Sequence, residues 1–416
     1  MVELMLRVPV KLARPGMVLA QVLHHPRRAG AVLLREGFSL DVRTIDRLEE
    51  LCVRDVWIRY PGLHDLAAHI GAEMREAAGT LAGRIESAMD HLARGGHVRL
   101  DYPAYRDAVT GLLAALANNP DAAGFLEELV STGGPESRHA CNVCMISLLI
   151  GLKLDFYISL ERKRMPVGRA RGLADLGMGA MLHDVGMLRL DPAVRERWEA
   201  TGDESDPSFR EHVRLGFDAI KDHADPVVAS IVLNHHQRFD GTGFPERESA
   251  SGRHRVGGHD VHIFARIVAG ADLFDRLRYG PGAAGPAPAP AVSALQRLRT
   301  RHFAGALDPL VEVALINVVP AYPPGSLVRL SDGRMAAVVS WKPADPCRPL
   351  VQVIERLDPR GEPGERLDLA EREGLLIAEA EGQPVLHDNF FPRTAGEFDL
   401  HAVCRRMLNR ADELAA

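Results

Sequence analysis

The strongest restriction on the fold of this chain comes from histidines and aspartates that lie on the apolar stripes of successive predicted helices. Residues 103–320 follow a helical pattern almost throughout, with polar or Gly/Pro-rich loops between the helices. The apolar stripe of an amphipathic helix faces the protein core. Polar groups on such stripes therefore point into a common interior, where each unpaired group costs roughly 1–3 kcal/mol.

These polar residues are distributed over five segments of the helical region. They are His139 in HACNVCMISLLI, His183 and Asp184 in GMGAMLHD, His212 in FREHVRLG, His235 and His236 after an apolar run, and Asp272 with Asp275 in RIVAGADLFD. One such histidine alone is more often a hydrogen-bonded core residue than a ligand. A His-Asp pair, a His-His pair and partners on separate helices together indicate a shared metal cluster, because facing helices of bundles hold dinuclear sites in this way.

The stretch NHHQRFDGTGFP, residues 234–245, contains the adjacent histidines. Neighbouring residues on a helix differ by about 100° around its axis. His235 and His236 can therefore reach the same or adjacent metals only if the backbone opens after them. Gly241 and Gly243 are expected to provide that opening.

The segments on either side of the helical region have a different texture, and the chain is long enough for two or three domains. We predict a small α+β domain at 1–62, a helical linker at 63–102, the helical metal-binding domain at 103–320, and a small β unit with a terminal helix at 321–416. A hairpin around Asp332-Gly333 is expected in the last of these. The Pro/Ala/Gly tract at 280–291 is expected to be a mobile loop. The predicted fold class is mainly α, with a helical bundle core and small flanking α+β and β units.

Charge and hydropathy restrict the classes of partner and the location that we expect for this chain. The formal net charge of −6 and the pI of about 6.3 disfavour a nucleic acid polymer as partner. No stretch reaches the roughly 20 apolar residues of a membrane span, and the N-terminus carries charges where a signal peptide is apolar. A cytoplasmic location follows by default. Cys141 and Cys144 form a CxxC without a second pair, so two core cysteines are favoured over a zinc ribbon.

Together, the order and spacing of these motifs resemble the HD-GYP family of HD-domain phosphohydrolases. The matching stretches are His139, LHDVGM at 182–187, HVRLG at 212–216, HHQRFDGTGFP at 235–245 and ARIVAGADLFDRL at 265–277. The flanking segments also look like a known arrangement, with a short α+β domain before the HD-GYP module and a small β unit after it.

The resemblance implies an all-α HD-domain core that holds two, sometimes three, iron or manganese ions and hydrolyses the bacterial second messenger cyclic di-GMP. Seven residues match the family's dinuclear ligands: His139, His183, Asp184, His212, His235, His236 and Asp272. Asp184 would bridge the metals, and His183 and Asp184 would be central to catalysis. The glutamate of the optional third metal falls on Pro135, with Glu136 one position away, so a third metal is not expected.

The chain departs from the family pattern at several substrate-handling positions. Met187 stands where HDIGK has its lysine, Gln237 where HHE has its glutamate, and Phe244 where GYP has its tyrosine. The remaining loop residues, Asp240, Gly241, Gly243 and Pro245, are intact. The basic positions of the family's R-P-Y-K segment fall on Pro281 and Ala284, so the nearby Arg276 and Arg278 are the candidate substrate-binding residues.

Three functions compete. The first is a metal-dependent cyclic di-GMP phosphodiesterase with reduced or altered activity, which releases linear pGpG and/or GMP. The second is a catalytically degenerate HD-GYP protein that binds signalling partners such as diguanylate cyclases, with a homodimer left open. The third is a phosphohydrolase of another nucleotide. If the missing cation at Met187 limits catalysis, turnover is expected to rise in a Met187→Lys variant.

Overall fold

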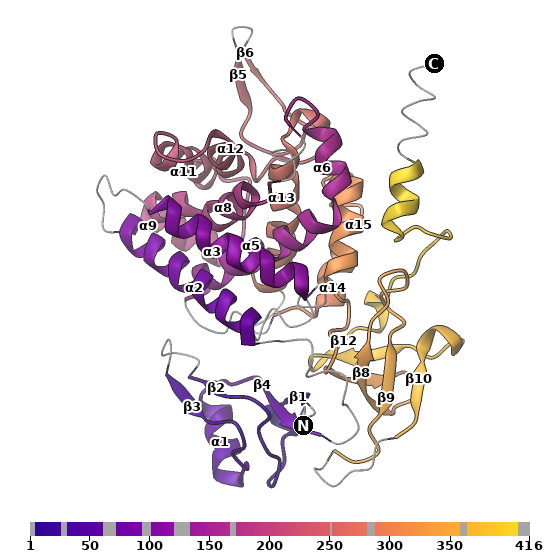
Figure 1. Cartoon of the computed structure of the whole chain (residues 1–416). Coiled ribbons are helices and arrows are strands. Elements are labelled where there is room, and N and C mark those ends of the chain that lie inside the picture. The colour runs from indigo at the N-terminus through magenta and orange to yellow at the C-terminus, as the bar shows by residue number, and fades with distance from the viewer. Residues whose placement is uncertain are drawn as a thin grey trace. The chain divides into compact units, whose positions relative to one another are not determined.

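The computed structural model describes residues 5–25, 31–60, 72–93, 101–119, 134–166, 172–249, 252–280, 288–357 and 364–406 (Figure 1). The chain divides into two compact units. One contains residues 1–71, 290–296 and 319–395, and the other contains residues 72–289, 297–318 and 396–416. The greater part of the tract that was expected to be a mobile loop, 281–287, lies outside the described residues.

The larger unit is helical, which confirms the predicted fold class. Its helices are α2 (Ala72–Ala93), α3 (Tyr102–Asn118), α5 (Pro135–Lys153), α6 (Asp155–Glu161), α8 (Ala174–Leu182), α9 (Pro192–Thr201), α10 (Pro207–Arg210), α11 (His212–Ile220), α12 (Pro226–Asn234), α13 (Ile263–Tyr279) and α15 (Pro309–Val318). The 3-10 turns η4 (Val185–Arg189) and η5 (Gly258–Asp260) and a short hairpin of β5 (Arg247–Ser249) and β6 (Gly252–His254) also belong to the unit. Helix α14 (Ala291–Leu298) has residues in both units.

Three helices of this unit begin with the same dipeptide. Asp191, Asp206 and Asp225 each precede a proline that is the first residue of α9, α10 or α12. Each carboxylate accepts a hydrogen bond from the backbone N–H two residues on, at 2.8–2.9 Å. Aspartate is a favoured N-cap, and proline fits the first helical turn because no intrahelical donor is lost there. Asp-Pro therefore sets where these helices start.

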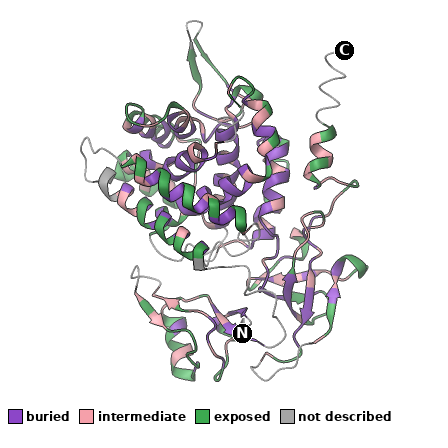
Figure 2. Ribbon diagram, viewed as in Figure 1, coloured by how far each residue is buried: buried purple, intermediate pink, exposed green. Residues whose placement is uncertain are grey.

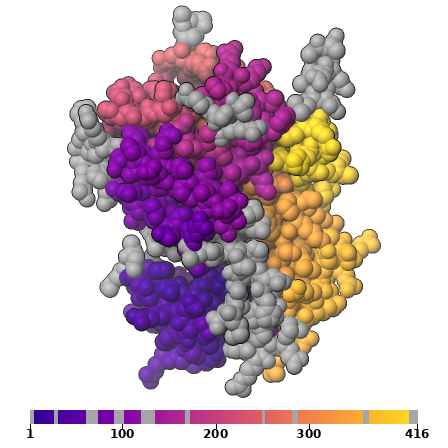
Figure 3. Space-filling view, viewed as in Figure 1, coloured from indigo at the N-terminus to yellow at the C-terminus, as the bar shows by residue number. Residues whose placement is uncertain are grey.

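Helices α5, α8 and α13 form the centre of the helical unit, where Figure 2 shows mostly buried residues. They are apolar around most of their circumference, which is the pattern of a fully enclosed helix. Helices α2 and α3 pack against each other and against α5. Their outward side chains form the continuous purple surface in Figure 3. The range 63–102, predicted to be a linker, thus contributes α2 to the helical unit.

The smaller unit is built from short strands. Strand β1 (Met5–Pro9) pairs antiparallel with β4 (Asp55–Arg59), and α1 (Val42–Glu50) begins at its N-cap Asp41. Strands β2 (Leu23–His24) and β3 (Val32–Leu34) form a second pair. A six-stranded antiparallel sheet has the order β10-β9-β8-β7-β11-β12; its strands are β7 (Leu327–Leu330), β8 (Met335–Ser340), β9 (Leu350–Val353), β10 (Arg366–Asp368), β11 (Ile377–Ala380) and β12 (Gln383–Pro384). The turns η1 (Val10–Leu12) and η6 (Leu369–Glu371) lie between strands, and η7 (Leu386–Asp388) follows β12.

The two ends of the chain share the core of this unit. Leu6 and Val8 of β1 lie in one buried cluster with Leu327 of β7 and Ala337 of β8. The backbone N–H of Arg7 donates to the carbonyl of Gly325 at 2.9 Å. Residues from 1–62 and from 321–357, predicted to lie in separate flanking domains, therefore share one buried core, whereas the described residues 396–406 belong to the helical unit. The predicted hairpin at Asp332-Gly333 is confirmed by the β7–β8 pair.

No single helix among the described residues is long and apolar enough to cross a membrane. Helices α5 and α6 reach the required length only together, and they meet at an angle of 85°.

Candidate metal centre

All seven residues predicted to be ligands meet in the helical unit. They form two overlapping groups, Asp184 with His212, His235 and His236, and Asp184 with His139, His183 and Asp272. Within each group the potential ligand atoms lie within 4.8 Å of one another. Asp184 belongs to both groups. The structure thus brings these residues together as predicted, and their role as metal ligands stays a proposal.

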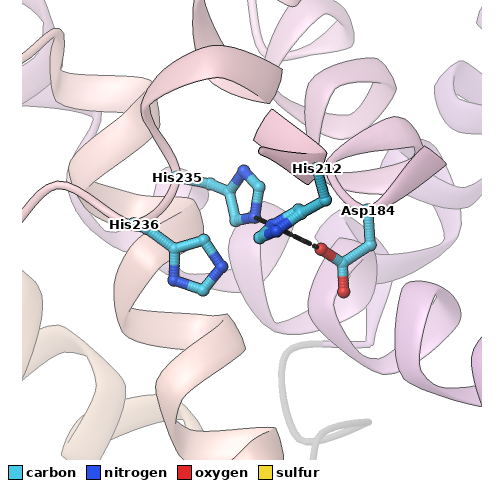
Figure 4. Close-up of side chains that lie close together, drawn as sticks. All are labelled: Asp184, His212, His235 and His236. Carbon is cyan, nitrogen blue, oxygen red and sulfur yellow. Dashed lines mark hydrogen bonds and ion pairs between the residues drawn. The ribbon is translucent and has the colours of Figure 1, made fainter. Parts of the chain in front are cut away.

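The first group surrounds one oxygen of Asp184 (Figure 4). Its Oδ1 atom lies 3.3 Å from Nε2 of His235 and 3.5 Å from Nε2 of His212. The two Nε2 atoms are 3.4 Å apart. His236 lies beside them, and its ring centroid is 5.0 Å from that of His212. Two imidazoles thus face one carboxylate oxygen, and a third lies beside them.

The second group surrounds the other oxygen. Oδ2 of Asp184 lies 3.6 Å from Nε2 of both His139 and His183. Oδ1 of Asp272 lies 3.1 Å from Nε2 of His139 and 3.7 Å from Nε2 of His183. Asp184 thus presents one oxygen to each group, which is the arrangement that a bridging carboxylate requires.

In four of the imidazoles the other ring nitrogen, Nδ1, already has a hydrogen-bond partner. Nδ1 of His183, His212 and His235 contacts the backbone carbonyl three residues earlier, at 2.7, 2.7 and 2.9 Å respectively. Nδ1 of His139 contacts Oδ2 of Asp275 at 2.7 Å. Carbonyls and carboxylates accept only, so each Nδ1 carries the proton. The lone pair of Nε2 is then directed at the centre, as in metal sites whose ligands are oriented by such partners.

Helix ends place most of these side chains. His183 follows α8, His212 begins α11, and His235 and His236 follow α12. The approach of Asp184 to His212 depends on Gly186, because a Cβ there would lie 1.9 Å from the carbonyl oxygen of His212. Only glycine allows the turn after Asp184 to dock this closely on α11.

Electrostatics favour ionised carboxylates and neutral imidazoles. Burial opposes ionisation of Asp184 and Asp272, but nearby histidines and Arg276 outweigh it, and the pKa of each carboxyl lies well below its usual range. Burial lowers the pKa of His235 and His236, and lowers that of His212 to about 3. Metal binding requires deprotonated ligands, so these groups are in the state that binds a cation.

His139 is the exception. Burial disfavours its charged form, but Asp272 and Asp275 outweigh burial and raise its pKa to about 10. At neutral pH its Nε2 therefore carries a second proton, which faces Oδ1 of Asp272 at 3.1 Å. A metal bound at this nitrogen would take the place of that proton.

The glycine-containing loop after the two histidines supports His236. The ring of Phe244 stacks on His236, with centroids 4.5 Å apart and planes 16° from parallel. Gly241 adopts a φ of +77°, and a Cβ on Gly243 would lie 2.4 Å from the carbonyl oxygen of His236. The predicted opening of the backbone is thus present. Asp240 closes the turn by accepting from the backbone N–H and hydroxyl of Thr242, and Pro245 accepts from Nε2 of Gln237 at 2.5 Å.

Three further residues contact the centre without having been assigned a role from the sequence. Asp275 holds His139 and accepts from Nδ2 of Asn142 at 2.8 Å. The sequence pattern that could have revealed the role of Asp275 is its position three residues after Asp272, on the same helix face. Glu204, in the loop before α10, lies 3.6 Å from Arg276 and 3.9 Å from His236. The ring of Trp198 packs against the guanidinium of Arg276, whose Cζ atom lies 5.1 Å from the ring centroid. Neither Glu204 nor Trp198 has a pattern that could have revealed its place.

A cavity of about 510 Å³ opens onto the centre. Its lining includes His139 and Asp184, and these are the most exposed of the candidate ligands, with side chains 19% and 17% exposed. The lining residues are Met89, Pro135, Glu136, Arg138, His139, Asp184, Met187, Leu188, Arg195, Trp198, Glu199, Asp275, Arg276, Tyr279 and Gly280. Of the two arginines predicted to bind substrate, Arg276 is in this lining, whereas Arg278 is buried near the Tyr279 ring and is not.

The donor set fits divalent cations. Oδ1 of Asp184 is buried without a hydrogen-bond donor among the described residues, although two imidazole nitrogens lie within 3.5 Å of it. Imidazole and carboxylate ligands suit iron, manganese and zinc. A buried oxygen surrounded by nitrogens whose protons point away is satisfied by a cation, and by none of the neighbouring side chains alone.

Fold and site together define a helical bundle with a histidine- and aspartate-lined centre that could hold two metals. Residues 169–307 match the HD domain family, and residues 327–383 match the KOW domain associated with HD domains. The chain therefore contains an HD domain followed by the KOW domain associated with HD domains, and the predicted resemblance to the HD-GYP family is confirmed.

Several characterised proteins are similar to this chain. A cyclic di-GMP phosphodiesterase of Pseudomonas aeruginosa is 26% identical over 385 residues, which is 84% of each chain. The cyclic di-GMP phosphodiesterase response regulator RpfG of Xanthomonas campestris is 34% identical over 24% of this chain and 25% of its own. A 3′3′-cGAMP-specific phosphodiesterase of Vibrio cholerae is 30% identical over 28% of this chain and 22% of its own. An HD-GYP-type protein from Bdellovibrio bacteriovorus shares 18% identity, with a TM-score of 0.42 over 75% of this chain and 98% of its own.

Proposed function

We propose that this protein is a metal-dependent phosphodiesterase that hydrolyses cyclic dinucleotides, with cyclic di-GMP as the first substrate to test. The observation that carries the proposal is the convergence of five histidines and two aspartates beside an open cavity. The similarity to one cyclic di-GMP phosphodiesterase over 84% of the chain supports the choice of substrate.

We propose that the seven predicted ligands hold two metal ions, with His139, His183 and Asp272 on one side of Asp184 and His212, His235 and His236 on the other. Iron and manganese are the metals to test first, because the donors are imidazoles and carboxylates without thiolates. Such ions, when bound, supply Lewis acidity and a nucleophile at neutral pH.

The residues of the chain itself would position the substrate. Arg138, Arg195 and Arg276 line the cavity and offer guanidinium donors for phosphate oxygens. Tyr279 and Trp198 provide aromatic faces in the same lining, which suit a purine base. Asp184 lines the cavity, and the neighbouring His183 is buried; these two are the candidate catalytic residues. Apolar neighbours such as Leu188 and Met187 limit the access of water.

Product formation tests the proposal. Protein loaded anaerobically with Fe(II) or Mn(II) is incubated with cyclic di-GMP and, separately, with 3′3′-cGAMP, and linear dinucleotide and mononucleotide products are separated by chromatography. We expect linear product from cyclic di-GMP with loaded protein and none after chelation. The 3′3′-cGAMP reaction decides the substrate range, because relatives act on either compound. Loaded protein that forms no product from either compound contradicts the proposal.

A second candidate function is a regulatory HD-GYP protein with a structural metal centre. Met187 and Gln237 favour it, because neither supplies the charge found at these positions in the family pattern. Gln237 is buried, and its Oε1 atom has no hydrogen-bond donor among the described residues. This candidate predicts two bound metals per chain, no turnover, and metal-dependent binding of a signalling protein such as a diguanylate cyclase in a pull-down with purified components.

A further inference from the structure

We infer that Arg276 is the phosphate-binding cation of this site and that it replaces the lysine expected at position 187. The inference deepens the proposed function and rests on it for the identity of the substrate. It concerns one side chain on α13 that the structure places between the metal centre and the cavity.

The guanidinium of Arg276 is fixed beside three candidate ligands. Its Nε atom donates to Oδ1 of Asp272 at 2.7 Å. One terminal nitrogen, Nη2, lies 3.3 Å from both Oδ2 of Asp184 and Nε2 of His236. The group therefore contacts both halves of the centre, and its orientation is set by the residues that would bind the metals.

The other terminal nitrogen has spare donor capacity. Nη1 of Arg276 is buried and has no hydrogen-bond acceptor among the residues that the structure describes. Oε1 of Glu204, at 3.6 Å, is too distant to accept. The side chain is only 10% exposed, yet it lines the cavity. A buried guanidinium N–H without an acceptor is costly, and an oxygen of a bound phosphate would satisfy it with matched geometry.

Two aromatic rings pack against the guanidinium and restrict its orientation. The Cζ atom of Arg276 lies 5.1 Å from the ring centroid of Trp198 and 6.0 Å from that of Phe209. These two rings stack on each other at 3.9 Å. Met187 packs into the same apolar cluster and also lines the cavity. The thioether at 187 thus belongs to the apolar support of Arg276, and a lysine there would bring a second cation into the same cavity.

This arrangement provides the charge that phosphodiester hydrolysis needs. The oxygen of water forms a bond to phosphorus, and the bond from phosphorus to the leaving ribose oxygen breaks. The leaving oxygen takes up the proton that the attacking water loses. Negative charge grows on the non-bridging oxygens meanwhile, and a fixed guanidinium donor stabilises it. Arg276 keeps all its protons throughout, because a guanidinium does not deprotonate in proteins.

Binding of inorganic phosphate to the Mn(II)-loaded protein, measured by calorimetry, tests the inference without requiring turnover. We expect phosphate to bind about 10- to 100-fold more weakly to Arg276→Ala than to the wild type. Arg276→Lys should restore part of the affinity because it keeps the charge without the fork. Arg197→Ala, which removes an exposed arginine of α9, should leave the affinity unchanged. Equal affinity in wild type and Arg276→Ala overturns the inference, as does a wild type that does not bind phosphate.

Bound metal and thermal unfolding are measured for each variant, because Arg276 also contacts Asp184 and Asp272. If Arg276→Ala does not fold or retain metal, the comparison is made with Arg276→Gln and Arg276→Lys at equal metal content. Weaker phosphate binding by Arg276→Gln than by Arg276→Lys supports the inference, and equal binding overturns it.

Turnover of the generic diester bis(p-nitrophenyl) phosphate provides a second test, with position 187 as the partner. Met187→Lys alone should not raise turnover, because Arg276 already supplies the cation; this revises the gain expected from the sequence. In an Arg276→Ala background, Met187→Lys should recover part of the lost activity. A several-fold gain from Met187→Lys in the wild-type background, with no loss in Arg276→Ala, contradicts the inference. If the wild type cleaves neither cyclic di-GMP, 3′3′-cGAMP nor bis(p-nitrophenyl) phosphate, the proposed enzymatic function is rejected. The phosphate titration still decides the role of Arg276 in that case.

Discussion

The Nε2 atoms of His139 and His183 lie 3.1 Å apart, although each ring already donates from its Nδ1 to another acceptor. Two unprotonated nitrogens at this distance would repel each other. A single cation between the rings and Asp272, either a proton or a metal ion, removes the conflict. The raised pKa of His139 shows that a proton takes this role when no metal competes for it. The geometry thus favours metal binding with release of that proton.

Removal of Asp184 should affect both metals. Its two oxygens face different groups of histidines, so Asp184→Asn is expected to lower bound Mn(II) from about two ions per chain to below one. His212→Ala removes a ligand of one group only and should leave about one ion. Elemental analysis after gel filtration measures both values. Equal losses in the two variants would contradict a bridging role for Asp184.

Asp275 should control metal affinity without binding metal itself. It accepts the Nδ1 proton of His139 at 2.7 Å, and such partners of ligands typically contribute 10- to 100-fold in affinity. Asp275→Asn keeps the shape but loses the charge, so we expect a Mn(II) dissociation constant about tenfold higher or more. Titration against a fluorescent chelator gives the constant. Asp218→Asn, an exposed residue of α11, is the matched control.

Stability should depend on pH through His262. Its Nδ1 accepts from the backbone N–H of Phe264 and caps α13, while burial, with the cations Arg162 and Arg266, lowers its pKa to about 4 despite the opposing charge of Glu161. The unfolded chain binds this proton below about pH 6.5 and the native state does not. The contribution is therefore complete above pH 6.5 and is lost as the pH falls towards 4.

The matched variant for this effect is His262→Asn, which can still cap the helix but does not titrate. Between pH 7 and pH 4.5 the wild type should lose on the order of 2 kcal/mol more of its free energy of unfolding than the variant. Urea unfolding at a series of pH values measures the difference. Parallel pH profiles for the two proteins would show that His262 does not contribute.

Removing one partner of the buried ion pair between Arg266 and Asp308 should strongly destabilise the fold. Their side chains are 2% and 0% exposed, and Asp308 also accepts from the hydroxyl of Tyr157 at 2.8 Å. Asp308→Ala leaves a buried guanidinium short of a partner, so we expect a loss of about 3–5 kcal/mol. Arg106→Ala breaks the more exposed pair with Asp175 and should cost about 1 kcal/mol or less. Denaturant unfolding compares the two, and similar losses would argue against the buried pair.

The sequence by itself determined the helical core and the identity of the candidate ligands. Apolar residues at helical spacing and Asp-Pro starts act within a few residues, and they are legible without tertiary structure. Histidines on apolar stripes had to meet polar partners in the interior, so convergence of His139, His183, His212 and Asp184 was predictable. The turn after His236 was predictable for a similar reason, because it depends on the local freedom of its glycines.

Only the tertiary structure decided what surrounds those ligands. Glu204 and Trp198 reach the centre from a loop and a helix whose sequences carry no periodic signal. Arg276 and Arg278 were equivalent in the sequence, but the 200° between them around α13 directs only the first to the cavity. The shared core of the N-terminal strands and the C-terminal sheet was equally hidden. Periodicity records which face of an element is buried, whereas contacts between distant segments are fixed only when their surfaces pack together.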